Sequence, residues 1–80
     1  MLINVNKLKG KIIENGMTIE SLAMAMGIDR STLYRKLKND GDTMLIKDAN
    51  RIVEVLHLEC EDAIDIFLPK LSHDMRQKSA

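Results

Sequence analysis

The segment from Gly27 to Asp40, GIDRSTLYRKLKND, gathers side chains that can bind anions and hydrogen-bond acceptors. It contains four basic side chains, Arg30, Arg35, Lys36 and Lys38, together with several hydroxyl groups. A guanidinium donates paired hydrogen bonds to planar acceptors, and an ammonium neutralises phosphate as a point charge. Such a set on one short helix indicates a nucleic-acid contact, although an exposed basic face on its own is usually only a solvated surface.

The other reactive side chains do not suggest a second kind of site. Cys60 is the only cysteine, which excludes an internal disulfide, and no base accompanies its thiol in the sequence. His57 and His73 lack the spacing of metal ligands, so neither a metal nor another cofactor is expected. No Ser/His/Asp set, phosphate-binding glycine loop or pair of carboxylates favours catalysis, and an enzyme is not expected.

Length and composition indicate one small helical domain. The chain has 80 residues, of which 45% are hydrophobic, with one Phe, one Tyr and no Trp. A core built from Leu, Ile, Met and Ala suits packed helices. No apolar run approaches the ~20 residues of a membrane span, and no secretory leader is seen, so a cytoplasmic protein is expected.

The zero net charge hides an asymmetry along the chain. Residues 1–38 carry seven basic and three acidic side chains, whereas residues 39–80 carry five basic and nine acidic ones. This division suggests one face for an anionic partner, although scattered surface charges would give the same sums.

Capping residues and glycines delimit two helices in the first third of the chain. Asn4 caps the first helix, and Gly16 ends it in the left-handed conformation. Thr18 caps the second helix, and Gly27 ends it. Their buried faces are predicted from helical spacing to be Val5, Leu8, Ile12 and Ile13, then Ile19, Leu22, Ala23 and Met26.

Three further helices are predicted after Gly27. Asp29 caps the third, Leu33 and Leu37 point inward, and a turn cluster over residues 39–42 follows. The apolar positions of the last two helices are Ile46, Ala49, Ile52, Val53 and Leu56, then Ala63, Ile64, Phe67 and Leu68. The sequence thus predicts an all-α, five-helix domain over residues 1–70 and a polar tail over residues 71–80.

The second and third helices make a helix-turn-helix, and here the sequence resembles a known family. TIESLAMAMGIDRSTLYRKL, residues 18–37, looks like the helix-turn-helix of phage repressors and Cro proteins, the lambda-repressor-like or XRE family. The shared elements are Ala23, Gly27 four residues later and apolar Leu33 six beyond that. The resemblance implies a compact lambda-repressor-like fold. It also implies a small transcriptional regulator, a repressor of phage or mobile-element origin, that binds a double-stranded DNA operator.

The resemblance also implies contact residues on a recognition helix over about Arg30–Lys38 in the major groove. The expected base-reading residues are Arg30, Ser31, Thr32 and Arg35. The expected phosphate contacts are Thr18, Tyr34, Lys38 and Asn39, whereas Asp29 is expected to cap rather than read.

One departure leaves two rotations of this helix open. Family members usually carry an apolar residue nine positions after the turn glycine, where this chain has Lys36, and Leu37 takes the apolar role. A helix rotated by one position would move base reading toward Arg30 and Tyr34 and leave Arg35 on the backbone.

The fifth helix is apolar on more than one face. Ile64 and Phe67 can close the core, which leaves Ile66, Leu68 and Leu71 for a homodimer, formed free or only on DNA. The alternative is that these residues simply cap the monomer core. A different function also stays open, namely a protein-interaction module of the same fold, such as an antitoxin or anti-repressor.

Overall fold

The computed structural model describes residues 2–68 and contains no strand within that range. Its elements are α1 (Val5–Glu14), α2 (Ile19–Met26), α3 (Arg30–Leu37), the short 3₁₀ helix η1 (Lys38–Gly41), α4 (Ile46–Leu56) and α5 (Cys60–Phe67). The predicted all-α, five-helix fold is therefore confirmed. The predicted tail over residues 71–80 lies outside the described residues.

Side-chain caps begin the first two helices, as the sequence predicts. The Asn4 side-chain oxygen accepts the Lys7 N–H at 3.1 Å. At the start of α2, the Thr18 hydroxyl oxygen accepts the Ser21 N–H at 3.1 Å, and the Ser21 hydroxyl accepts the Thr18 N–H at 2.8 Å. This reciprocal pair satisfies two backbone donors that the helix itself leaves unpaired.

The core is a single cluster of hydrophobic side chains to which all five α-helices contribute. Its fully buried large residues are Leu8, Ile12, Leu22, Leu33, Met44, Ile52, Leu56 and Ile66. Two positions predicted to be buried are instead exposed, Ile13 by 73% and Ile46 by 72%. Each neighbours a true core position along the chain or lies at a helix start, so the 3.6-residue period turns it toward solvent.

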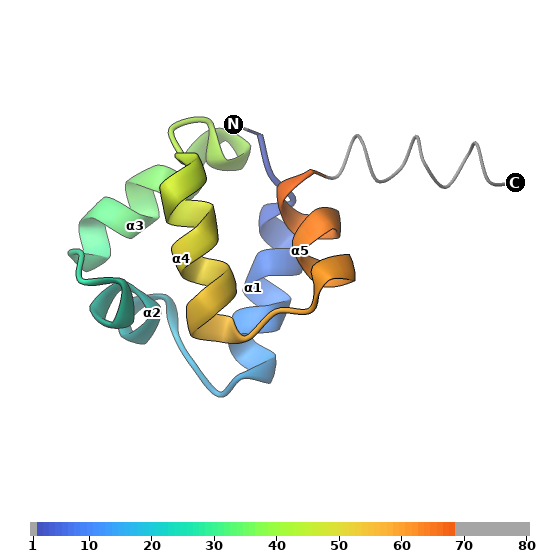
Figure 1. Cartoon of the computed structure of the whole chain (residues 1–80). Helices are drawn as coiled ribbons and strands as arrows, with labels where there is room; N and C mark the ends of the chain where they lie inside the picture. Colours follow the sequence, from blue (N-terminus) through green and yellow to red (C-terminus); the bar gives the residue numbers. More distant parts are fainter. Residues whose placement is uncertain (1, 69–80) are drawn as a thin grey trace, which may run out of the picture.

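The helices are arranged so that α3 and α5 lie on opposite sides of the molecule, with α4 between them (Figure 1). Contacts join α2 to both α3 and α4, and join α1 to α5. The α2–α3 pair therefore rests on the core through α4, and the outer face of α3 is left uncovered.

Backbone hydrogen bonds hold the end of α3 in place. Asn39 and Asp40 in η1 both adopt left-handed conformations, with φ of 53° and 58°. The Asp40 carbonyl accepts the Ile3 N–H at 2.7 Å, and the Ile66 carbonyl accepts the neighbouring Asn4 N–H at 2.7 Å. The start of the chain thus links the loop after α3 to α5.

Candidate nucleic-acid interface

A tight turn sets the angle between α2 and α3. Gly27 ends α2 with φ of 75°, and the Ile28 N–H donates to the Ala23 carbonyl at 3.0 Å. Ala23 and Leu33 are fully buried at the contact between the helices, and Leu37 is 7% exposed. Because both leucines face the core, the structure has the rotation of α3 that was predicted from them.

Lys36 turns toward α4 instead of joining the outer face of α3. Its Nζ lies 2.9 Å from Asp48 Oδ2, and the two side chains are only 19% and 10% exposed. The same carboxylate oxygen accepts the Leu45 N–H at 3.1 Å, at the start of α4. The position that departs from the family pattern thus carries an ion pair at the edge of the core.

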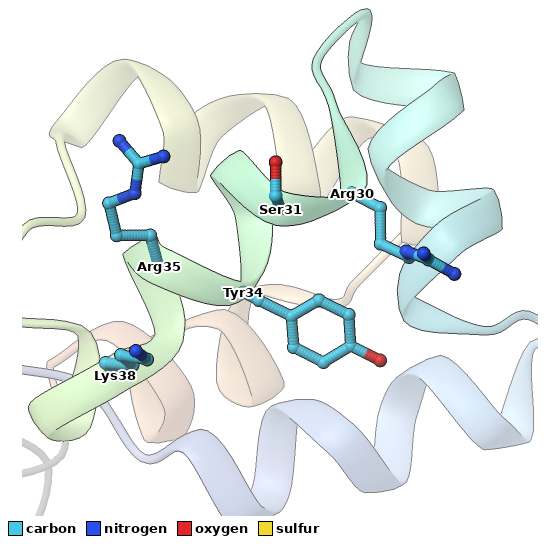
Figure 2. Close-up of a pocket in the computed structure, with 5 residues that line it drawn as sticks. All are labelled: Arg30, Ser31, Tyr34, Arg35 and Lys38. Carbon is cyan, nitrogen blue, oxygen red and sulfur yellow. The ribbon is translucent and has the colours of Figure 1, made fainter.

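The outward face of α3 borders an open hollow of about 490 Å³. It is lined by Arg30, Ser31, Tyr34, Arg35 and Lys38. In the view of Figure 2, Ser31 and Arg35 project to one side of the helix, and Arg30 and Tyr34 extend to the other. The helix therefore presents guanidinium, ammonium, hydroxyl and phenol groups together on one exposed surface.

Three of the predicted contact residues lie outside this hollow. Thr32 is half-buried on the flank of α3, and Thr18 caps α2. Asn39 follows α3 in the left-handed conformation and is exposed. Thr32 therefore lies on the flank of α3 and Asn39 in η1, which follows it, whereas Thr18 lies at the start of α2.

The polar groups at the start of α3 are already engaged. Arg30 Nη1 lies 3.2 Å from Glu20 Oε2 of α2. Asp29 occupies the N-cap position, yet its side chain makes no capping bond to the helix backbone. Its carboxylate instead accepts the Ser31 hydroxyl at 3.0 Å, so the predicted side-chain cap is wrong. The short serine side chain competes successfully for the same acceptor.

Arg35 and Lys38 differ from the other cations of this region. Among residues 2–68, neither has a carboxylate within ion-pair distance, whereas Arg30 pairs with Glu20 and Lys36 with Asp48. Two cations one helical turn apart are therefore available to an external anion.

The charge asymmetry of the sequence is partly neutralised within the fold. Lys7 of α1 lies 2.9 Å from Asp65 and 3.5 Å from Asp62 of α5, and Lys11 lies 3.0 Å from Asp62. The hydrogen bond from Lys11 is the main reason why the pKa of Asp62 is lowered. The basic surface available to an anionic partner is accordingly narrower than the sequence count suggested.

The predicted dimer surface needs a correction at Ile66. Its side chain is fully buried in the core, and its carbonyl accepts the Asn4 N–H from the start of the chain. Leu68 is 48% exposed, and Leu71 lies outside the described residues. An apolar groove of about 320 Å³ lies between α4 and α5, with Ile46, Val53, Ile64, Phe67 and Leu68 among its walls.

Sequence reasoning missed the acidic partners of the site. No contact was expected of Glu20 or Asp48 from the sequence, yet Glu20 pairs with Arg30 and Asp48 with Lys36. The members of each pair are 10 or 12 residues apart, so only the folded arrangement of the helices reveals them. Within residues 2–68, no three acidic, His or Cys side chains are placed to hold a metal, and no helix is suited to crossing a bilayer.

Comparison with protein families identifies a match over most of the chain. Residues 7–67 match the model of the Cro/C1-type HTH DNA-binding domain, a range that includes the α2–α3 unit and the whole outer face of α3. Neither the comparison with curated proteins nor that with solved structures finds a match.

Proposed function

Because this chain belongs to the Cro/C1-type helix-turn-helix DNA-binding family, we propose that it binds a double-stranded DNA operator sequence-specifically and acts as a small transcriptional repressor. The observation that carries the proposal is the exposed hollow on α3, where Arg35 and Lys38 have no carboxylate partner among residues 2–68. An α-helix fits the major groove of B-DNA, and repression follows when the occupied operator blocks a promoter.

The proposed DNA contacts fall into two sets, residues that read bases and residues that contact phosphates. Arg35 can donate two parallel hydrogen bonds to guanine, and Ser31 projects to the same side of the helix. Arg30 and Thr32 complete the proposed set of base-reading residues. Thr18, Tyr34, Lys38 and Asn39 are proposed to contact phosphates, which fix the position of the protein without specifying sequence.

A second copy of the chain is the proposed occupant of the α4–α5 groove. Ile46, at 72% exposure, and Leu68, at 48%, stand on its walls, so its apolar surface continues outward. Because α3 lies on the opposite side of the molecule, a dimer through this groove keeps both recognition surfaces uncovered (Figure 1). Dimeric helix-turn-helix proteins bind two half-sites about one helical turn of DNA apart or multiples of it.

Sedimentation tests this assembly. The wild-type protein is expected to sediment as a dimer, free or on a palindromic duplex, and Ile46→Glu is expected to give a monomer with unchanged helicity. A wild-type protein that stays monomeric in both conditions would exclude the dimer.

Selection from a pool of random DNA duplexes tests the proposed function. The wild-type protein is expected to enrich one related set of sequences, and a variant with both Arg35→Ala and Lys38→Ala is expected to enrich none. If the wild-type protein enriches no sequence and binds bulk duplex DNA no better than this variant, the operator-binding proposal fails. The apolar groove would then favour the alternative of a protein-interaction module.

A further inference from the structure

Glu20 lies beside the proposed DNA-binding surface, where its carboxylate pairs with Arg30. It lies in the first turn of α2, and Arg30 is the first residue of α3. The distance between Arg30 Nη1 and Glu20 Oε2 is 3.2 Å, although the two side chains are 62% and 61% exposed. An acidic group so close to the hollow is unfavourable for a surface that binds a polyanion, because charges within about 10 Å interact at 0.1 M salt.

We propose that Glu20 is a specificity-determining residue, which holds the Arg30 guanidinium away from phosphates and so penalises binding to unmatched DNA. This inference rests on the proposed operator binding. Non-specific binding is carried by cations that neutralise phosphates. A guanidinium held by a carboxylate is less available for that role.

The same ion pair orients Arg30 for a specific site. The contact occupies Nη1 and leaves the remaining N–H groups of the guanidinium for an acceptor on a base. In Figure 2 the side chains of Arg30 and Arg35 extend from opposite sides of α3. The Arg30 side chain lies on the side that borders α2. Loss of Glu20 therefore frees Arg30 to contact phosphate on any duplex but gives no new contact at a matched site.

The test compares Glu20→Gln in the wild-type and Arg30→Ala backgrounds. The probes are the duplex selected by the wild-type protein and a shuffled duplex of equal length and composition. Glu20→Gln is expected to strengthen binding to the shuffled duplex about two- to five-fold, the range expected for an exposed ion pair. Binding to the selected duplex should be unchanged or weaker, and in the Arg30→Ala background the gain should disappear.

Glu54→Gln is the matched control. Glu54 pairs with Arg51 on α4 at 3.6 Å, is also exposed, and does not border the α3 hollow. It changes the net charge by the same amount, so it should affect both duplexes equally. Equal tightening of both duplexes by Glu20→Gln, no tightening at all, or tightening that persists without Arg30 would overturn the inference. A wild-type protein that does not distinguish the two duplexes would overturn the proposed function as well.

Discussion

Arg35 near the end of α3 and Lys38 directly after the helix are expected to contribute differently to DNA binding. The planar guanidinium of Arg35 matches two acceptors on the edge of guanine. The ammonium of Lys38, at the junction of α3 and η1, is a single strong charge suited to phosphate. Specificity should therefore depend on Arg35 and salt sensitivity on Lys38.

Substitution of each residue separates the two contributions. Lys38→Ala should weaken binding to all duplexes similarly and lower the salt slope by about one ion. Arg35→Lys should retain non-specific binding but lose discrimination, because an ammonium cannot make the two-pronged contact. Titrations of a selected and a shuffled duplex at two salt concentrations measure both effects. Full recovery of discrimination by Arg35→Lys would assign Arg35 to the backbone.

At the residue scale, the sequence predicted which side chains gather on α3 but not how they are engaged. Arg30, Ser31, Tyr34 and Arg35 line the hollow because they follow the outward phase of α3, and Lys38 joins them directly after the helix. The partners of Arg30 and Ser31 depend on competition between nearby acceptors. Spacing along the chain does not resolve that competition.

At the element scale, substitution by alanine is predicted to have opposite effects on stability at Gly10 in α1 and at Gly27 in the α2–α3 turn. Gly27 has φ of 75° and Gly10 lies inside α1, and a Cβ at either position would meet no atom within 4 Å. Gly27→Ala should therefore destabilise by about 1–2 kcal/mol through backbone strain alone. Gly10→Ala should stabilise by about 0.5–1 kcal/mol through helix propensity. Chemical denaturation measures both, and changes of the same sign would contradict this account of the turn.

The Lys36–Asp48 pair is predicted to secure α3 against α4. Asp48→Ala removes the partner of both the Lys36 ammonium and the Leu45 N–H, and should destabilise by about 1–3 kcal/mol. Adding Lys36→Met should recover part of this loss, since an apolar side chain tolerates the site better than an unpaired charge.

Thermal unfolding of the single and double variants measures this coupling. Arg51→Ala is the control, because the pair of Arg51 with Glu54 is exposed. Its loss should change the free energy of unfolding by less than about 0.5 kcal/mol. If Asp48→Ala costs no more than this control, the pair does not hold α3.

Helix starts and ends were the most predictable elements, because they depend on local chemistry. Asn4, Thr18 and Gly27 act where the sequence placed them. The end of α4 was not predictable in this way, since His57 rather than a glycine adopts the left-handed conformation there, with φ of 51°. The burial of Ile66 was missed for a related reason, because the docking of the chain start on α5 is a long-range contact.

At the scale of the whole molecule, ion pairs between α1 and α5 should make stability depend on pH. The pKa of Asp62 is lowered from 3.8, chiefly by the hydrogen bond from Lys11. This group therefore stabilises the fold above its unfolded pKa and loses that contribution as the pH falls through the lower folded value. The pKa values of Lys7 and Lys11 are raised from 10.5, chiefly by hydrogen bonds to Asp65 and Asp62. Their contribution is complete below 10.5 and is lost as the pH rises through the raised values.

Unfolding curves measured at a series of pH values are expected to show that the free energy of unfolding falls below about pH 4 and again above about pH 10.5. Asp62→Asn should lower stability between these limits and flatten both slopes, whereas Glu54→Gln should leave them intact. Identical pH profiles for the wild-type protein and Asp62→Asn would show that the pairs contribute nothing.

The overall charge pattern was the feature least readable from sequence. The basic first half and acidic second half do not form two separate faces, because α1 packs on α5 and pairs Lys7 and Lys11 with Asp62 and Asp65. A sum over sequence cannot distinguish a basic surface from bases that the fold neutralises. Within residues 2–68, Arg35 and Lys38 remain exposed without an ion pair beside the α3 hollow, as do Lys9 and Lys47 elsewhere.

The central claim is that α3 reads bases in the major groove, and removal of a single acceptor atom from the DNA tests it most directly. In the duplex selected by the wild-type protein, each guanine is replaced in turn by 7-deazaguanine, which lacks the N7 acceptor. At one position, this replacement should weaken wild-type binding about ten-fold, within the 1–3 kcal/mol of a two-pronged contact. The Arg35→Ala protein should already have lost that energy and respond little to the replacement. If every replacement leaves wild-type binding unchanged, or if Arg35→Ala responds as fully as the wild-type protein, α3 does not read guanine through Arg35.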